Sequence, residues 1–307
     1  MVDSSLVTKL IPLYILVGFG FLAGRQLSIK GQEIGRLLLY FLSPAVIFRG
    51  FFEAEFDGTI LLLPMLTLLM ACFLGWGGLQ TARYKWRNGT ERILAFSSGT
   101  GNTGFFGIPA TLSLLGDEAF PYLVISVFGF IAYEVSYGYY IVMRIHSGGK
   151  KAFLRVLAYP GLHACWMGLF FNAFDLTLPD FASTTITYLT DGYTLLGMMI
   201  VGLGLAEMKT TRLDFSYLCF SLGIKFLVWP LAMAGVVALD RTLFGLIPEL
   251  AQWVLLCASL MPMAAMTIVH ATVQNSDPDK ASVAVGLSTL FALVYLPFGL
   301  AVFRLLF

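Results

Sequence analysis

Charge is scarce in this sequence. Asp, Glu, Lys and Arg make up 12% of its 307 residues, whereas hydrophobic residues make up 58%. A water-soluble globular domain carries about twice that share of charge, so this class of protein is excluded. Cysteine is rare too, and all four cysteines fall inside strongly apolar stretches, which argues against a disulfide framework and for small apolar packing residues.

Motifs of catalysis and nucleotide binding are absent as well. The sequence has no His-Glu-x-x-His, no Gly-x-Ser-x-Gly and no nucleotide-binding glycine loop with a lysine. An intramembrane enzyme, the main alternative from another class, would need a nucleophile with a base or a pair of catalytic aspartates within its spans. Asp191 is the one clear mid-span aspartate. We therefore expect no enzyme, no catalytic residue, no metal site and no cofactor. Transport, if this is the function, would be driven by a gradient.

Long apolar stretches run through the whole chain. An α-helix needs about 20 mostly apolar residues to cross the hydrocarbon core of a bilayer. The fold class predicted is therefore an all-α integral membrane protein. Ten windows meet the requirement, and they predict transmembrane helices at 6–24, 32–50, 59–82, 91–114, 118–143, 152–172, 182–206, 213–239, 248–272 and 279–306.

Basic residues are distributed unevenly between the predicted loops. Loops 1–2, 3–4, 5–6, 7–8 and 9–10 hold fourteen of the 19 lysines and arginines, and the other side holds Lys9, Arg49, Arg241 and Arg304. Because cytoplasmic loops are enriched in Lys and Arg, the first set of loops is predicted to be cytoplasmic. Both termini are then extracytoplasmic, and the chain is expected in the cell (inner) membrane.

The basic loop "RIHSGGKK" (144–151) divides the ten windows into five and five. An odd number of spans makes the second half enter the membrane from the opposite side, as in an inverted repeat. The loops after the fourth and ninth windows agree, because Asp117 and Asp277 each stand where a carboxylate could cap the next helix. The predicted domains are a first five-helix repeat at 1–145, a short cytoplasmic linker at 146–151 and a second, inverted five-helix repeat at 152–307.

Two of the windows carry helix breakers at matching positions. "FSSGTGNTGFFGIPA" (96–110) contains four glycines and a proline, and "SLMPMAAMT" (259–267) contains Pro262. Asn102 and Pro262 each lie 15 residues before the loop aspartate of their half. In lipid, broken helices survive only where protein or a water-filled cavity satisfies the freed backbone groups. Matching breaks in inverted halves predict a transport site near the bilayer midplane, where helices 4 and 9 cross.

Close helix packing is the alternative explanation of these glycines. Three glycines of the first stretch stand one helical turn apart, and Gly20 and Gly24 form a Gly-x-x-x-Gly pair in the first window. Such spacing lets two helices approach closely. Asn102 and Pro109 are not needed for tight packing, so the broken helix is favoured.

The stretch "GTGNTGFFGIPA" (99–110) resembles the auxin efflux carrier family, which includes plant auxin exporters and bacterial permeases for malonate, malate and related organic acids. "LLYFLSPAVIFRGF" (38–51) resembles the second span of that family, and "SLMPMAAMTIVHATVQNSDPDKASVAVGLSTLFALVYLPF" (259–298) resembles its ninth and tenth spans. The resemblance implies ten spans in two inverted repeats, with spans 4 and 9 unwound where they cross, and an architecture related to bile acid:sodium symporters. Plant members carry a long hydrophilic loop between spans 5 and 6. The short loop here favours a bacterial-type permease.

The unwound segments suggest where a substrate would bind. The N-terminal end of a half-helix offers N–H donors and partial positive charge, which suits an anion. Asn102 could contact the substrate directly, or its amide could only satisfy the broken backbone. The candidate substrate-binding residues are Asn102, Thr103, Gly104 and Pro109 in the fourth span, and Pro262, Met263 and Thr267 in the ninth.

Ionisable residues inside membrane spans are costly and usually functional. Glu134 lies ten residues before Arg144, about 15 Å of helix from the cytoplasmic end, and could bind and release a proton. Lys225 could hold a carboxylate substrate or substitute for a coupling cation. Asp191 and His270 complete the candidate coupling residues. The alternative is structural, with Lys225 paired to Glu134 or Asp191 and with His270 an ordinary interfacial residue.

Together these features predict a secondary transporter, a permease or efflux carrier, for a small organic anion such as a carboxylate, working by alternating access at the helix 4 and helix 9 crossing. The alternatives are a sodium-coupled symporter of a bile-acid-like anion, and a membrane receptor or channel of the same fold. H⁺ coupling or uniport is favoured over Na⁺, because the crossing lacks carboxylates for a sodium site. The expected partners are the organic anion and the lipid bilayer, with no nucleic acid and with a homodimer left open.

Overall fold

The protein is helical throughout the residues that its computed structural model describes, which are 4–55, 59–87, 89–143, 159–208 and 213–307. No β-strand occurs in these ranges, and the predicted all-helical, multi-pass membrane class is confirmed. Seven segments within them are long and apolar enough to cross a membrane: Val7–Gln26, Gly31–Phe52, Leu62–Ala82, Asp117–Val142, Asp180–Glu207, Phe215–Phe244 and Pro278–Leu306.

Of the three remaining windows, two are interrupted helices and the third is described only in part. The window at 91–114 consists of α5 (Thr90–Gly99), the π-helical turn η2 (Thr103–Gly107) and α6 (Ile108–Leu115). The window at 248–272 consists of α14 (Glu249–Ser259) and α15 (Met266–Val273). The predicted linker 146–151 lies outside the described residues, and so does the start of the window at 152–172. The described part of that window is α10 (Pro160–Ala173).

The other helices follow the predicted windows to within a few residues. Their bounds are α1 (Ser4–Gln26), α2 (Gly31–Leu37), η1 (Leu38–Leu42), α3 (Ser43–Phe52), α4 (Leu62–Ala82), η3 (Asp117–Ala119), α7 (Phe120–Val135), α8 (Tyr137–Met143), α11 (Asp180–Glu207), α12 (Phe215–Gly223), η4 (Ile224–Val228), α13 (Trp229–Leu239), η5 (Asp240–Phe244) and α16 (Pro278–Leu306).

Prolines shape several of these helices. The turns η1, η2 and η4 each end two residues before a proline, and a proline leaves the carbonyl four residues earlier without its helical donor. Pro230 frees the carbonyl of Phe226, which accepts the Tyr295 hydroxyl at 2.6 Å. The Leu293 carbonyl, freed by Pro297, accepts the Tyr14 hydroxyl in the same way. Tyrosine hydroxyls therefore satisfy backbone groups that lipid could not.

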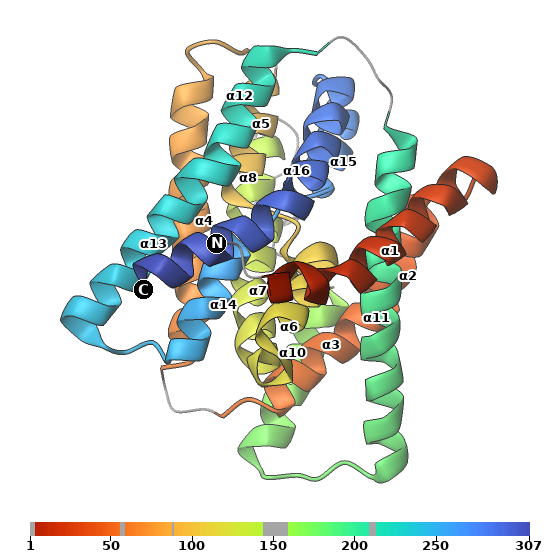
Figure 1. Ribbon diagram of the computed structural model, residues 1–307, viewed down its shortest axis with the longest axis vertical. Helices are drawn as coiled ribbons and strands as arrows, with labels where there is room; N and C mark the ends of the chain where they lie inside the picture. Colours follow the sequence, from red (N-terminus) through yellow and green to blue (C-terminus); the bar gives the residue numbers. More distant parts are fainter. Residues whose placement is uncertain (1–3, 56–58, 88, 144–158, 209–212) are drawn as a thin grey trace.

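The helices pack in two groups. The first holds α1 against α11 and α3 against α10, and the second is built around α4, α5, α7 and α12 to α16. In Figure 1, α11 stands beside α1 and α2, while α4, α12 and α13 lie on the opposite side of the view. The Gly-x-x-x-Gly pair in α1 faces α11, because a Cβ at Gly20 would lie 2.7 Å from the Met199 carbonyl carbon. Close packing of these two helices therefore depends on glycine.

Polar contacts join several connections at one end of the molecule. The Thr90 hydroxyl donates to Asp277 at 2.7 Å, and Lys280 pairs with Asp214 at 3.2 Å. A hydrogen bond from the Tyr217 N–H, and then the neighbouring Lys280, hold the pKa of Asp214 below its usual value. These contacts place the connections before α5, before α12 and before α16 on the same side.

The capping predicted for the two loop aspartates is wrong. Asp277 does stand at the N-cap of α16, but its φ of 51° is left-handed and its side chain makes no capping hydrogen bond. Its carboxylate instead accepts from the Thr90 hydroxyl, because tertiary packing brings α5 beside it. Asp117 begins the 3₁₀ turn η3, whose N-cap position is occupied by Gly116 with φ 91°.

Candidate functional site

The interruptions of the fourth and ninth windows touch each other. α5 ends at Gly99, and Thr100 continues in extended conformation with φ −137° and ψ 166°. The Asn102 N–H then donates to the Pro262 carbonyl at 2.8 Å, although 160 positions separate them in the chain. We call this meeting point the crossing. It satisfies an N–H and a carbonyl that the broken helices leave free.

Asn102 also starts the second half of its broken helix. Its side-chain oxygen accepts the Phe106 N–H at 3.3 Å, and its carbonyl accepts the Gly107 N–H at 2.9 Å. Asn102 is therefore an N-cap of η2, and backbone satisfaction accounts for part of its role. Its neighbour Gly104 is half-buried and lies against α11, because a Cβ there would be 3.0 Å from the Tyr193 hydroxyl.

The ninth-window side of the crossing is closely packed. Pro262, Met263 and Thr267 are all buried, and the Met263 N–H donates to the Ser288 hydroxyl at 3.1 Å. The Thr267 side chain is 0% exposed, and its hydroxyl has no hydrogen-bond partner. A buried polar atom without a partner is uncommon and calls for an explanation. A ligand or a second conformation of the crossing would provide one.

A buried lysine lies beside the crossing. Lys225, in η4, is 1% exposed and donates to the Thr100 carbonyl at 3.0 Å. The Thr100 hydroxyl donates in turn to Glu134 at 2.6 Å. Lys225 and Glu134 are therefore linked through Thr100 and form no direct ion pair. The ammonium also lies 4.9 Å from the centroid of the Trp229 ring, whose indole N–H donates to the Ser98 carbonyl at 2.7 Å.

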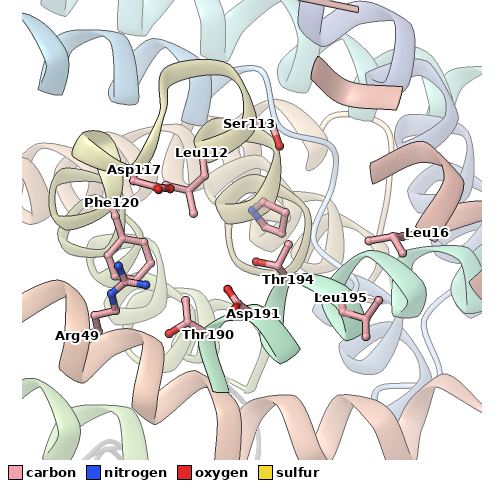
Figure 2. Close-up of a pocket in the computed structure, with 11 residues that line it drawn as sticks. Leu16, Arg49, Leu112, Ser113, Asp117, Phe120, Thr190, Asp191, Thr194 and Leu195 are labelled. Atoms are coloured by element: carbon pink, nitrogen blue, oxygen red, sulfur yellow. The ribbon is translucent and has the colours of Figure 1, made fainter. Parts of the chain in front are cut away.

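A cavity of about 430 Å³ opens beyond the crossing, between α6, α11, the middle of α1 and the C-terminal end of α3. Figure 2 shows Arg49, Asp117 and Asp191 around the same space, with Thr190 and Thr194 on α11. Arg49 is already held by Glu53 at 2.9 Å and lies over the Phe120 ring. The cavity lining carries one basic and two acidic side chains, so it is not by itself an anion-attracting surface. It is lined by Leu16, Arg49, Pro109, Leu112, Ser113, Asp117, Phe120, Thr190, Asp191, Thr194 and Leu195.

The structure distributes the candidate residues over three places. At the crossing lie Asn102, Thr103, Gly104, Pro262, Met263 and Thr267. Pro109 and Asp191 line the cavity, and Glu134 and Lys225 lie together at the C-terminal end of α5. His270 is buried and packs edge-on against Phe96, with ring centroids 4.5 Å apart, so it is set apart from these groups by aromatic packing.

Thr100 and Trp229 were not among the sequence candidates. Thr100 stands in the glycine-rich run itself, so the helix break was a signal that its carbonyl would lack a helical donor. Trp229 immediately precedes Pro230, and that proline was a signal for a distorted turn around Lys225. Which groups these two residues contact could not be read from the sequence.

Broken helices that meet inside a membrane protein are typical of secondary transporters. The sequence profile of a family described as membrane transport protein matches residues 5–300. The chain therefore belongs to this family, the auxin efflux carrier family, and the resemblance of its motifs to that family is confirmed. It is a multi-pass membrane transporter and not an enzyme.

Two archaeal relatives match the chain over almost its whole length. A transporter of Methanothermobacter thermautotrophicus is 25% identical over 97% of this chain and 98% of its own length. A transporter of Methanocaldococcus jannaschii is 26% identical over 94% of this chain and 95% of its own length. Both are described as uncharacterized transporters, so they support the class of protein and leave the substrate to be inferred from the site.

Proposed function

We propose that the protein is a secondary transporter of a small organic anion, a carboxylate, which binds at the crossing and moves by alternating access. The observation that carries this proposal is the hydrogen bond from the Asn102 N–H to the Pro262 carbonyl, which brings both helix breaks to one point. Helices η2 and α15 restart there, and helix N-terminal ends favour negative charge. The buried Thr267 hydroxyl is a donor without a partner on the same side.

The proposed architecture is ten spans in two inverted five-helix repeats, 1–145 and 152–307. Its support is the pairing of helices. The first span (α1) packs on the seventh (α11), and the sixth (α10) packs on the second (α3), which are the pairs that an inverted repeat would exchange. The charge distribution supports extracytoplasmic termini in the inner membrane, and a reporter fused after Phe307 would check this orientation.

Anion selectivity is proposed to lie at the crossing and not in the cavity. The cavity lining is acidic on balance, and its one arginine is already paired with Glu53. Its volume of about 430 Å³ is within the range of small-molecule sites. The cavity therefore suits a passage for a small solute between the extracytoplasmic side and the crossing.

Asn102→Ala tests the position of the site. We expect this change to weaken the binding of an organic acid by about 1 to 3 kcal/mol, because it leaves polar groups of the bound state unsatisfied. A thermal-shift screen of purified protein against dicarboxylates such as malonate and malate would first identify a ligand. Titration calorimetry on both proteins then gives the affinities, and uptake into proteoliposomes shows whether the ligand is transported.

Asn172→Ala is the matched control for Asn102→Ala. Asn172 is also half-buried and donates to two backbone carbonyls, those of Phe52 and Ala54, at 2.7 and 2.8 Å, but it lies in α10 away from the crossing. Both variants should lose stability, and only Asn102→Ala should lose affinity. A normal affinity for Asn102→Ala would move the site away from the crossing.

The proposed coupling ion is the proton, carried by Glu134. Glu134 is half-buried as a residue and lies in the membrane region. Its carboxylate accepts a hydrogen bond from the Thr100 hydroxyl, and the Thr100 carbonyl accepts one from Lys225. We expect Glu134→Gln to keep the Thr100 hydrogen bond but to remove the pH dependence of uptake in proteoliposomes. Asp191→Asn, in the cavity, should retain it. The reverse result would assign the proton to Asp191, and a pH dependence that survives in both variants would mean that neither residue carries it.

A further inference from the structure

A charged side chain of the protein, the Lys225 ammonium, lies at the C-terminal end of α5. The last carbonyls of a helix lack helical partners and carry partial negative charge. Here the Ser98 carbonyl accepts the Trp229 indole N–H, and the Thr100 carbonyl accepts the Lys225 ammonium at 3.0 Å. Lys225 comes from η4, 125 positions along the chain. Its charged group thus occupies the end of a half-helix inside the membrane.

The groups around the ammonium are those that would hold a free monovalent cation. They are the Thr100 carbonyl at an unwound helix end, the Glu134 carboxylate reached through the Thr100 hydroxyl, and the face of the Trp229 ring at 4.9 Å. Transporters with broken helices use unwound carbonyls and half-helix C-terminal ends to coordinate coupling cations. In this protein that position is filled by a side chain.

Two local features determine where the lysine lies: a glycine that leaves space for its ammonium and a turn that is held in place. Gly101 follows Thr100, and a Cβ there would lie 2.5 Å from the ammonium nitrogen and 2.9 Å from the carbon that bears it. The π-helical turn η4 ends two residues before Pro230, and its freed Phe226 carbonyl is bonded to Tyr295. The turn that carries Lys225 is therefore fixed from outside the crossing.

We propose that the Lys225 ammonium is a tethered replacement for a coupling metal cation at the end of α5, so that removing this side chain creates a site for a free monovalent cation. A lysine head is a compact point charge, as a monovalent ion is, but it cannot exchange with solution. If transport takes place at the crossing as proposed above, it follows that sodium does not drive the transport cycle by binding at this position. The cation site itself requires no substrate.

The test compares the melting temperature of purified wild type and Lys225→Ala in NaCl, KCl and N-methyl-D-glucamine chloride at equal ionic strength. We expect the wild type to melt at the same temperature in all three salts. Lys225→Ala should have a lower melting temperature in N-methyl-D-glucamine chloride. Its melting temperature should rise by at least about 3 °C, and saturate, as NaCl or KCl is added; methylammonium chloride, tested in the same way, could replace them. A ligand that binds only the folded state produces this behaviour.

Two further variants separate the proposal from a general salt effect. Lys9 also donates to a carbonyl in the last turn of a half-helix, that of Leu114 in α6 at 3.4 Å, but it is exposed; Lys9→Ala should show no cation response. The double variant Lys225→Ala/Glu134→Gln should lose the response, because the negative partner is gone.

Three outcomes would overturn the proposal. The first is a wild type whose melting temperature already depends on sodium or potassium, a result that needs no variant to fold. The second is a folded Lys225→Ala or Lys225→Gln that ignores every cation. The third is a cation response that survives Glu134→Gln in the double variant. None of these readouts involves substrate, so a misplaced substrate site would show in the Asn102→Ala affinity and not here.

Discussion

Gly101→Ala should reduce uptake in proteoliposomes by at least about tenfold, the factor that 1.4 kcal/mol of lost positioning represents. The added Cβ would lie 2.5 Å from the Lys225 nitrogen and 3.1 Å from the Pro262 carbonyl oxygen. The lysine head could move, but the Pro262 oxygen is backbone and already accepts the Asn102 N–H. The methyl group would therefore push Lys225 away from the Thr100 carbonyl or separate the two breaks.

Gly223→Ala is the matched control for Gly101→Ala. Gly223 lies at the end of α12, two residues before Lys225, and a Cβ there would meet nothing within 4 Å. Alanine should be tolerated and should stabilise the helix by about 0.5 to 1 kcal/mol. The prediction for Gly101 is contradicted if both variants transport at the wild-type rate.

The second large effect is expected at the contact between α1 and α11. In Gly202→Leu the first added atom would lie 2.6 Å from the Phe21 nitrogen and 2.9 Å from the Val17 carbonyl carbon, both of them backbone atoms of α1. No rotamer relieves a clash of Cβ with backbone, so the helices must separate. We expect a loss of at least about 3 kcal/mol in the free energy of unfolding, and a large drop in monodisperse protein on size exclusion.

Gly204→Leu provides the comparison within the same helix. Gly204 is exposed, and a Cβ there would meet nothing within 4 Å, so leucine would face lipid. Its melting temperature should equal or exceed that of the wild type. Equal losses in the two variants would mean that leucine disturbs α11 itself and that its packing on α1 is not the cause.

Hydropathy predicted the membrane class correctly because the insertion of a segment depends on its own residues. Each of the seven long helices coincides with a predicted window, within a few residues at most ends. Glycine and proline predicted the interruptions at 96–110 and 259–267 for an equally local reason, since each changes the helix that contains it. The number of spans and the inverted repeat stay predictions.

Predictions that depended on contacts with distant parts of the chain were less successful. Asp277 has the residue type and position of an N-cap, yet its carboxylate bonds to Thr90, which approaches from another part of the chain. Asp191 and Lys225 were both offered as mid-span charges. The structure places Asp191 at a cavity and Lys225 at the end of α5, where no pattern in the sequence could tell them apart.

By itself, the sequence determined that this protein is a bundle of membrane helices, that two of them are interrupted, and that it resembles one transporter family. Only the tertiary structure decided that the interruptions meet at Asn102 and Pro262, and that Thr100 stands between Lys225 and Glu134. The reason is physical. Glycine and proline decide where a helix breaks and which backbone groups lose their helical partners. The new partners of those groups come from distant segments, and only the packing of the helices determines which segments lie close enough.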